Sequence, residues 1–96
     1  MLRAQDRERL LAAFGESVRE LRSVIGISQE ELGLRCGVNR TYVSGIELGN
    51  RNPTLWVLWR LSEGLATSPG KLLERAQTRF EGRRQGTGTR RRRTAR

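Results

Sequence analysis

The feature that most constrains the fold is the short distance between the end of one predicted helix and the start of the next. Ser28 and Glu31 fit a capping box, in which the carboxylate of Glu31 reaches back to the cap. Gly37 tolerates the positive φ that an abrupt helix end requires. Asn39 is a favourable cap for another helix, from Arg40 to about Leu48. The chain must therefore place two short helices around a tight turn of about three residues.

The rest of the chain predicts three further helices and contains no strand pattern. Residues 6–25 repeat apolar side chains at helical spacing, and Gly26 ends this helix. Thr54 can cap a fourth helix, and Ser68 followed by Pro69 begins a fifth. The positions expected to face inward are Leu10, Phe14, Val18, Leu21 and Ile25 in the first helix, Leu55, Leu58, Leu61 and Leu65 in the fourth, and Leu72, Leu73, Ala76 and Phe80 in the fifth. The predicted fold is all-α with five helices.

Charge divides the chain into a domain and a tail. The formal net charge is +9 over 96 residues, which is enough chain for one domain with a modest core. Seven of the 19 basic residues lie in residues 82–96, where there is no acid, so residues 1–81 carry only +2. Apolar residues almost vanish after Gly82, so burial cannot offset the entropy of ordering this segment. We expect a domain at 1–81 and a disordered, Arg-rich tail at 82–96.

Several kinds of chemistry are excluded by what the sequence lacks. Histidine is absent, which removes the commonest general base and the commonest metal ligand. The single Cys36 can form neither an internal disulfide nor a zinc cluster, and its place among apolar residues predicts a small core side chain. No apolar run approaches the roughly 20 residues of a membrane span, and no signal peptide is evident. We expect a cytoplasmic protein that is not an enzyme and needs no metal or cofactor.

The helix that follows Asn39 carries two different faces. Val43 and Ile46 form a narrow apolar seam, while Arg40, Thr41 and Ser44 line another side. If the seam packs against the preceding helix, the polar start of this helix protrudes. Such a helix fits the DNA major groove, where Arg binds guanine in a bidentate manner and Thr contacts a base or a methyl group. Residues 28–48 are thus predicted as a helix-turn-helix, with 40–48 as the recognition helix.

This interpretation agrees with a resemblance to a known family. The segment SQEELGLRCGVNRTYVSGIELGNRNPTLWVLWRLSEGL resembles the helix-turn-helix domains of the XRE and phage lambda/434 repressor-Cro class. Within it, RTYVSGIE followed by RN resembles the controller proteins of restriction–modification systems. The resemblance extends from about Phe14 to Leu73 and implies a five-helix, lambda-repressor-like DNA-binding domain.

The resemblance also implies roles for individual residues. Gln29 would anchor a phosphate, and Arg40, Thr41 and Ser44 would face bases. Tyr42 would either contact phosphate or pack against the next helix. The full set of DNA-binding candidates is Gln29, Asn39, Arg40, Thr41, Tyr42, Ser44, Asn50, Arg51 and Asn52.

Two other positions matter within this family pattern. Arg22 would pair with Glu47 and tie the first helix to the recognition helix. Gly45 departs from the pattern, because many relatives carry a long polar side chain there that reads a base. The glycine at this position is explained either by a close approach to DNA or by drift.

The predicted function is sequence-specific binding of double-stranded DNA by a homodimer on a palindromic operator, to regulate transcription. Trp56 and Trp59 are spaced i and i+3, and we expect at least one of them in the core. The other, together with Leu72, Leu73 and Phe80, is a candidate for the dimer contact. One alternative is an antitoxin that binds a toxin, or another regulator, and controls its own gene through the same motif. A second is a sequence-blind nucleic-acid or RNA binder driven by the tail.

Overall fold

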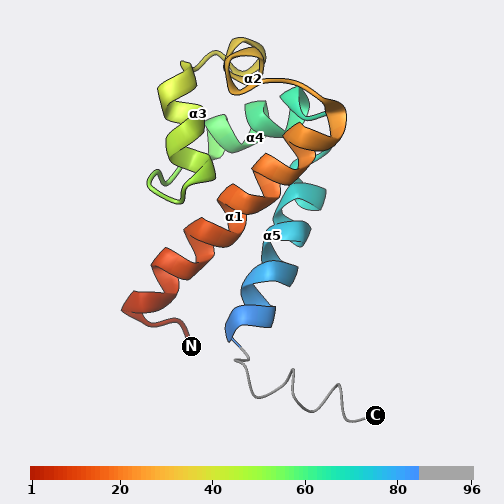
Figure 1. Cartoon of the computed structure of the whole chain (residues 1–96). Helices are drawn as coiled ribbons and strands as arrows, with labels where there is room; N and C mark the ends of the chain where they lie inside the picture. Colours follow the sequence, from red (N-terminus) through yellow and green to blue (C-terminus); the bar gives the residue numbers. More distant parts are fainter. Residues whose placement is uncertain (85–96) are drawn as a thin grey trace.

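The computed structural model describes residues 1–84 and contains five helices in this part of the chain. They are α1 (Ala4–Ile25), α2 (Gln29–Cys36), α3 (Arg40–Glu47), α4 (Leu55–Gly64) and α5 (Pro69–Arg84) (Figure 1). No strand occurs among residues 1–84, so the predicted all-α, five-helix fold is confirmed. The domain boundary expected at Gly82 falls inside α5, which continues to Arg84. The rest of the predicted tail, residues 85–96, lies outside the described residues.

The helix boundaries follow from the predicted capping residues. Gly26 and Gly37 end their helices in the left-handed conformation, with φ of 76° and 77°. The side-chain oxygens of four caps accept a backbone N–H three residues ahead, at 2.8 to 3.2 Å, and these caps are Ser28, Asn39, Thr54 and Ser68. The capping-box prediction is corrected in one respect, because the carboxylate of Glu31 faces Arg35 one turn along, 3.5 Å from its Nε.

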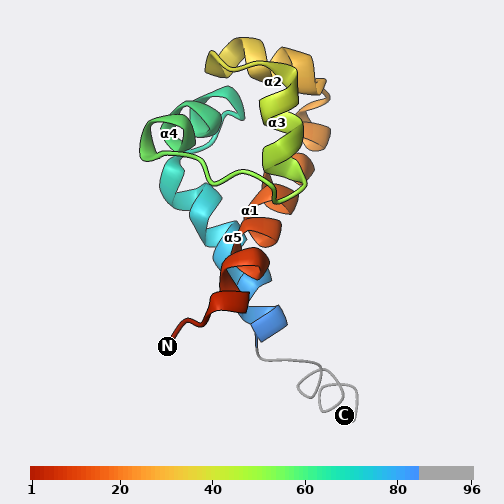
Figure 2. The same cartoon turned by 90° about the vertical axis from the view of Figure 1, so that its left-hand side faces the viewer.

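The longest helices, α1 and α5, lie side by side and run in opposite directions (Figures 1 and 2). The short helices α2, α3 and α4 gather at the end of the molecule where α1 finishes and α5 begins. The core lies where all five meet, and its fully buried side chains include Val18, Leu32, Val43, Ile46, Leu61, Leu65 and Leu72. None of the helices in this described part is long and apolar enough to cross a membrane.

Two glycines set how closely the DNA-facing helix candidate, α3, approaches its neighbours. A Cβ atom on Gly15 of α1 would lie 2.2 Å from the carbonyl oxygen of Ile46 in α3. A Cβ atom on Gly33 of α2 would lie 2.5 Å from the carbonyl oxygen of Val38, in the turn before α3. Both distances are shorter than any van der Waals contact, so a larger residue at either position would push α3 away from the body of the domain.

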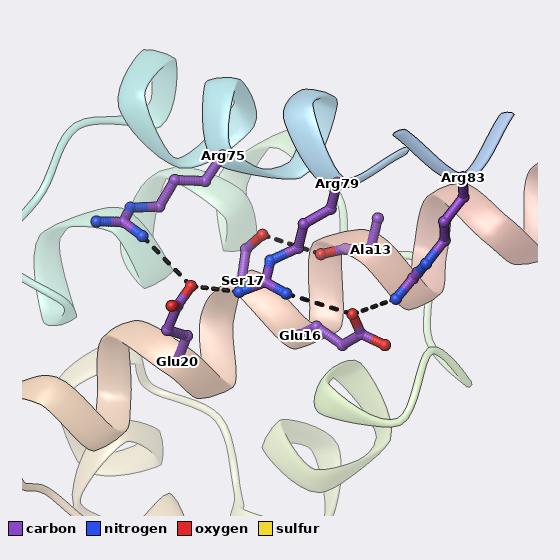
Figure 3. Close-up of polar contacts among 7 residues, drawn as sticks. All are labelled: Ala13, Glu16, Ser17, Glu20, Arg75, Arg79 and Arg83. Atoms are coloured by element: carbon purple, nitrogen blue, oxygen red, sulfur yellow. Dashed lines mark hydrogen bonds and ion pairs between the residues drawn. The ribbon is translucent and has the colours of Figure 1, made fainter. Parts of the chain in front are cut away.

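A ladder of ion pairs joins the exposed sides of α1 and α5 (Figure 3). Arg75 lies 3.3 Å from Glu20, and Arg79 lies 3.5 Å from Glu16 and also pairs with Glu20. Arg83 pairs with Glu16 and so extends the ladder into the last turn of α5. Each exposed pair is worth less than about 1 kcal/mol, but the ladder gives Arg83, the residue after Gly82, a partner on α1. This explains why α5 does not stop where the apolar residues end.

The predicted dimer contacts divide into buried and exposed residues. Leu72 and Phe80 are buried, with 0% and 5% of their surface exposed, so they contribute to the core. Leu73 is exposed. The expectation that at least one tryptophan is in the core is wrong, because Trp56 is 68% exposed and Trp59 is 50% exposed. The inward face of α4 is instead filled by Leu58 and Leu61, together with the leucine that follows the helix.

Candidate nucleic-acid interface

The start of α3 projects from the domain while its other side is locked into the core. Val43 and Ile46 are fully buried, whereas Arg40 and Thr41 are exposed in the first turn. Ser44, one turn further along, is half-buried. Asn39 is exposed, and its side-chain oxygen accepts the N–H of Tyr42 at 2.8 Å, which caps the start of α3. The sequence prediction of one buried seam and one projecting polar side is confirmed for this helix.

A buried ion pair fixes the orientation of α3 relative to α1. The Nε of Arg22 lies 2.6 Å from one carboxylate oxygen of Glu47, and its second guanidinium nitrogen lies 3.1 Å from the other. The side chain of Glu47 is 4% exposed and that of Arg22 is 16% exposed. The hydrogen bonds that the Arg22 guanidinium donates to Glu47 raise the pKa of Arg22 above its usual value. The predicted pair is present and has the bidentate geometry that orients both helices.

Gln29 contributes to the same network. Its side-chain amide nitrogen donates to Glu47 at 3.0 Å, and the third nitrogen of Arg22 donates to the carbonyl oxygen of Ile27 at 2.9 Å. The start of α2 is thereby bound to the end of α3 and to α1. The family resemblance assigned Gln29 to phosphate alone, whereas in the structure its amide binds the carboxylate of Glu47 at the end of α3.

Tyr42, Gly45 and Arg51 form a second arrangement on the outer side of α3. The guanidinium carbon of Arg51 lies 5.3 Å from the centre of the Tyr42 ring, a favourable cation–π geometry. On the way to this ring, the side chain of Arg51 passes directly over Gly45. A Cβ atom on Gly45 would lie 2.7 Å from Cγ of Arg51. Gly45 therefore provides the space in which Arg51 lies across the helix.

The polar turn after α3 returns toward the same surface. Gly49 has a φ of 80° and its N–H donates to the carbonyl oxygen of Ile46 at 3.0 Å, while Asn50 donates to Gly45 at 2.8 Å. Asn50, Arg51 and Asn52 are all exposed. Figure 2 shows α3 and the turn that follows it on the same face of the molecule. The structure thus groups the predicted base-facing residues of α3 with the predicted residues of the turn.

Other residues that support this face were not predicted from the sequence. Arg35 of α2 donates to the carbonyl oxygen of Gly64 at 3.0 Å, and Arg60 of α4 donates to the carbonyl oxygen of Arg35 at 3.5 Å. The Cys36 thiol donates to the carbonyl oxygen of Arg60 at 3.4 Å, and burial raises the pKa of this thiol. These contacts bind α2 to α4. Their partners are far apart in sequence, so no local spacing could reveal them.

Nothing in this face resembles a metal site. Among residues 1–84, no cluster of three or more Cys, Asp or Glu side chains could hold a metal ion. What the face offers is an exposed helix start with Arg and Thr, an arginine stacked on a tyrosine, and a polar turn. Such groups can donate hydrogen bonds to phosphates and to base edges.

Comparison with known proteins places this geometry in context. A family model described as "Helix-turn-helix" matches residues 18–72. The control protein C.BamHI of Bacillus amyloliquefaciens is 42% identical over 62 residues, which is 64% of this chain and 76% of that protein. The solved structure of the restriction–modification controller C.AhdI from Aeromonas hydrophila is 42% identical, with a TM-score of 0.63 over 65% of this chain and 94% of its own.

A third relative was solved with DNA. The controller C.Esp1396I, as a tetramer in complex with its natural 35 base-pair operator, is 31% identical to this chain. The TM-score is 0.68, over 74% of this chain and 91% of that one. The matched segment contains α2, α3 and α4 together with Arg22, Gln29 and Glu47. The chain therefore belongs to the helix-turn-helix family of the XRE type, and its relatives include control proteins of restriction–modification systems.

Proposed function

We propose that this protein is a sequence-specific, double-stranded DNA-binding regulator of transcription that acts as a homodimer on a palindromic operator. The observation that carries the proposal is the exposed start of α3. Arg40 and Thr41 stand on a helix whose other side is buried and whose end is bound by Arg22 and Gln29 through Glu47. A rigidly held helix with exposed Arg and Thr can read base edges in the major groove.

The roles of the other candidates follow from their positions around α3. Arg40, Thr41 and Ser44 are assigned to bases. Arg51, stacked on Tyr42, is assigned to the phosphates or the bases beside them. Gln29, Asn39, Asn50 and Asn52 complete the set and are assigned to the DNA backbone. Backbone contacts fix the register of the protein on DNA, while the base contacts supply the preference for one sequence.

The relatives support a role in gene control. They include control proteins of restriction–modification systems, and C.Esp1396I was solved as a tetramer on its operator. A single helix of this size reaches only a few base pairs. A two-fold dimer doubles the sequence that is read and places the half-sites about one helical turn apart, on the order of 10 base pairs. The exposed apolar residues Trp56, Trp59 and Leu73 offer surface for such a dimer.

Selection of bound duplexes from a random pool tests the proposal directly. The expected product is a palindrome with half-sites about 10 base pairs apart, bound by two copies of the chain. The affinity for this duplex should exceed that for a scrambled duplex of the same composition by roughly a thousandfold or more. Recovery of no consensus, with equal affinity for selected and scrambled duplexes, would favour the sequence-blind binder and refute the proposal.

A further inference from the structure

One large apolar side chain lies exposed on the face that we assign to DNA. Leu48 is the C-cap of α3, and 69% of its surface is exposed. It is the only exposed large hydrophobic residue among residues 39–52. The other exposed residues of this segment are all polar or charged, and they are Asn39, Arg40, Thr41, Asn50, Arg51 and Asn52. Leu48 therefore differs in chemistry from everything around it on this face.

Leu48 lies on the same side of α3 as the residues assigned to bases. It is seven positions after Thr41 and four positions after Ser44, and both spacings return to the same side of an α-helix. The N–H of Leu48 donates to the carbonyl oxygen of Ser44 at 3.0 Å, so the helical spacing extends to this residue. Val43 and Ile46, which are fully buried, lie on the opposite side. Leu48 thus continues the line of Thr41 and Ser44 toward the end of the helix.

The neighbours of Leu48 on the helix surface leave it open to solvent. Gly45, three positions earlier, has no side chain that could cover it. The side chain of Arg51 crosses Gly45, but its guanidinium is directed to the ring of Tyr42, 5.3 Å from the ring centre. Leu48 remains 69% exposed beside this arrangement, so its apolar surface is free to contact another molecule.

The major groove offers one kind of apolar group to such a side chain. Base edges present hydrogen-bond donors and acceptors there, and thymine adds a 5-methyl group. A leucine side chain has neither donor nor acceptor, so it cannot bind a phosphate or a polar base edge. Placing it against such groups would remove their water without replacing the hydrogen bonds, which lowers affinity. The thymine methyl group is the partner that gains from contact with Leu48.

We propose that Leu48 is a further specificity-determining residue, which selects thymine through contact with its 5-methyl group. This inference rests on the proposed function, because it requires α3 to lie in the major groove. Leu48 is eight residues after Arg40, which corresponds to about 12 Å along an α-helix. Successive bases of one strand are about 3.4 Å apart. The selected thymine should therefore lie about three to four base pairs from the base that Arg40 contacts.

Replacing thymine with uracil tests the methyl contact, because uracil lacks the methyl group and keeps every hydrogen-bonding group of the base. The thymines of the selected operator are replaced one position at a time, in both half-sites together, and fluorescence anisotropy measures the affinity of the full-length chain. At the position assigned to Leu48, the affinity should fall by about fourfold for each half-site, or about fifteenfold in total. A duplex with 5-methylcytosine at this position should bind more tightly than one with cytosine, because the methyl group then occupies the same place.

Substitutions of Leu48 show whether this residue makes the contact. Leu48→Met keeps an apolar side chain of similar volume and should still discriminate against uracil. Leu48→Gln has a similar length but a polar end, and it should bind the thymine and uracil duplexes equally well. The matched control is Leu34→Gln, which changes an exposed leucine on α2 and should discriminate as the full-length chain does. Urea unfolding should give similar midpoints for all three variants, because Leu48 and Leu34 are both exposed.

Three results would overturn the role of Leu48. Selection could return a base other than thymine at this position, uracil could bind as well as thymine, or Leu48→Gln could keep the discrimination against uracil. Each of these results leaves the proposed function intact, provided that a palindrome is recovered. Recovery of no consensus would instead refute the proposed function, and the assignment of Leu48 with it.

Discussion

Arg40 is the residue whose exposure bears most directly on sequence readout, because it stands in the first turn of α3 with its side chain in water. Arg40→Ala should cost about 1–3 kcal/mol on the selected operator and relax the preference at one base position in each half-site. Fluorescence anisotropy with operator and scrambled duplexes measures both effects. Arg7→Ala is the matched control, since it removes the same charge from the far end of α1 (Figure 1). An equal loss on both duplexes would mean that Arg40 contacts only phosphate.

Glu47 contributes to the stability of the fold and fixes the orientation of α3. Its carboxylate accepts from Arg22 and Gln29 and is almost fully buried. Glu47→Ala leaves the Arg22 guanidinium partly buried without its partner, which should lower the free energy of unfolding by about 3 kcal/mol or more. The matched control is Glu31→Ala, which breaks an exposed pair with Arg35 and should cost under about 1 kcal/mol. Urea unfolding distinguishes these outcomes, and equal midpoints for the two variants would refute the shielding of Glu47.

The same network shows what the sequence could and could not predict for single residues. The Arg22–Glu47 pair was predicted through the family resemblance and is present. The bond from Gln29 to Glu47 was not predicted, because an amide can serve a phosphate and a carboxylate equally well. Gln29→Ala is therefore expected to weaken binding to operator and scrambled duplexes by similar factors and also to lower stability. A change in DNA affinity with unchanged urea unfolding would assign Gln29 to phosphate alone.

At the scale of the element, Gly45 couples α3 to the turn after it, because it leaves the space in which Arg51 of the turn reaches Tyr42 of the helix. Gly45→Ala removes a glycine from a helix, which is worth about 1 kcal/mol of stability. The new Cβ atom, however, would collide with Arg51 and displace it from Tyr42. The variant should therefore unfold no earlier than the unmodified chain and yet bind the operator more weakly.

A double-mutant cycle assigns this loss to Arg51. If Gly45→Ala acts by displacing Arg51, adding it to Arg51→Ala should cause little further loss of affinity. Anisotropy on the operator gives all four affinities, and urea unfolding shows that the folded population is unchanged. Fully additive losses would indicate that Gly45 approaches DNA directly, which is one of the two explanations that the sequence left open.

Local signals located the helices well, whereas tertiary contacts decided which faces they bury. Helix ends at Gly26 and Gly37 and caps at Asn39 and Thr54 depend on nearby backbone, so the sequence predicted them correctly. The sequence LWVLW of α4 is apolar on every side, and its periodicity cannot indicate which apolar residues face the core. The structure buries Leu58 and exposes both tryptophans. Packing against the other helices decides this, and the periodicity of α4 does not indicate it. On α5, Leu72 and Phe80 are buried as the periodicity predicts, whereas Leu73 is exposed.

At the scale of the whole molecule, charge is separated along the chain, and this separation should govern the salt dependence of DNA binding. All ten acidic residues lie in residues 1–81, and Arg83 is already paired with Glu16 of α1. A deletion that tests the tail should therefore begin after Arg84, so that the ladder between α1 and α5 stays intact. It removes residues 85–96, which carry five arginines and no acid. Such a segment can follow phosphates beyond the operator without preferring a sequence.

Each phosphate that the tail neutralises adds about 0.9 to the magnitude of the slope of log affinity against log salt concentration. Deleting residues 85–96 should thus flatten this slope by up to about 4.5 and weaken operator and scrambled duplexes by similar factors. The ratio between the two affinities should survive, because we propose that Arg40 and Thr41 set it. The matched control replaces the five arginines with glutamine at full length, which keeps the segment but removes its charge. An unchanged slope in both variants would show that the tail does not contact DNA, and a lost ratio would place the sequence preference in the tail instead of α3.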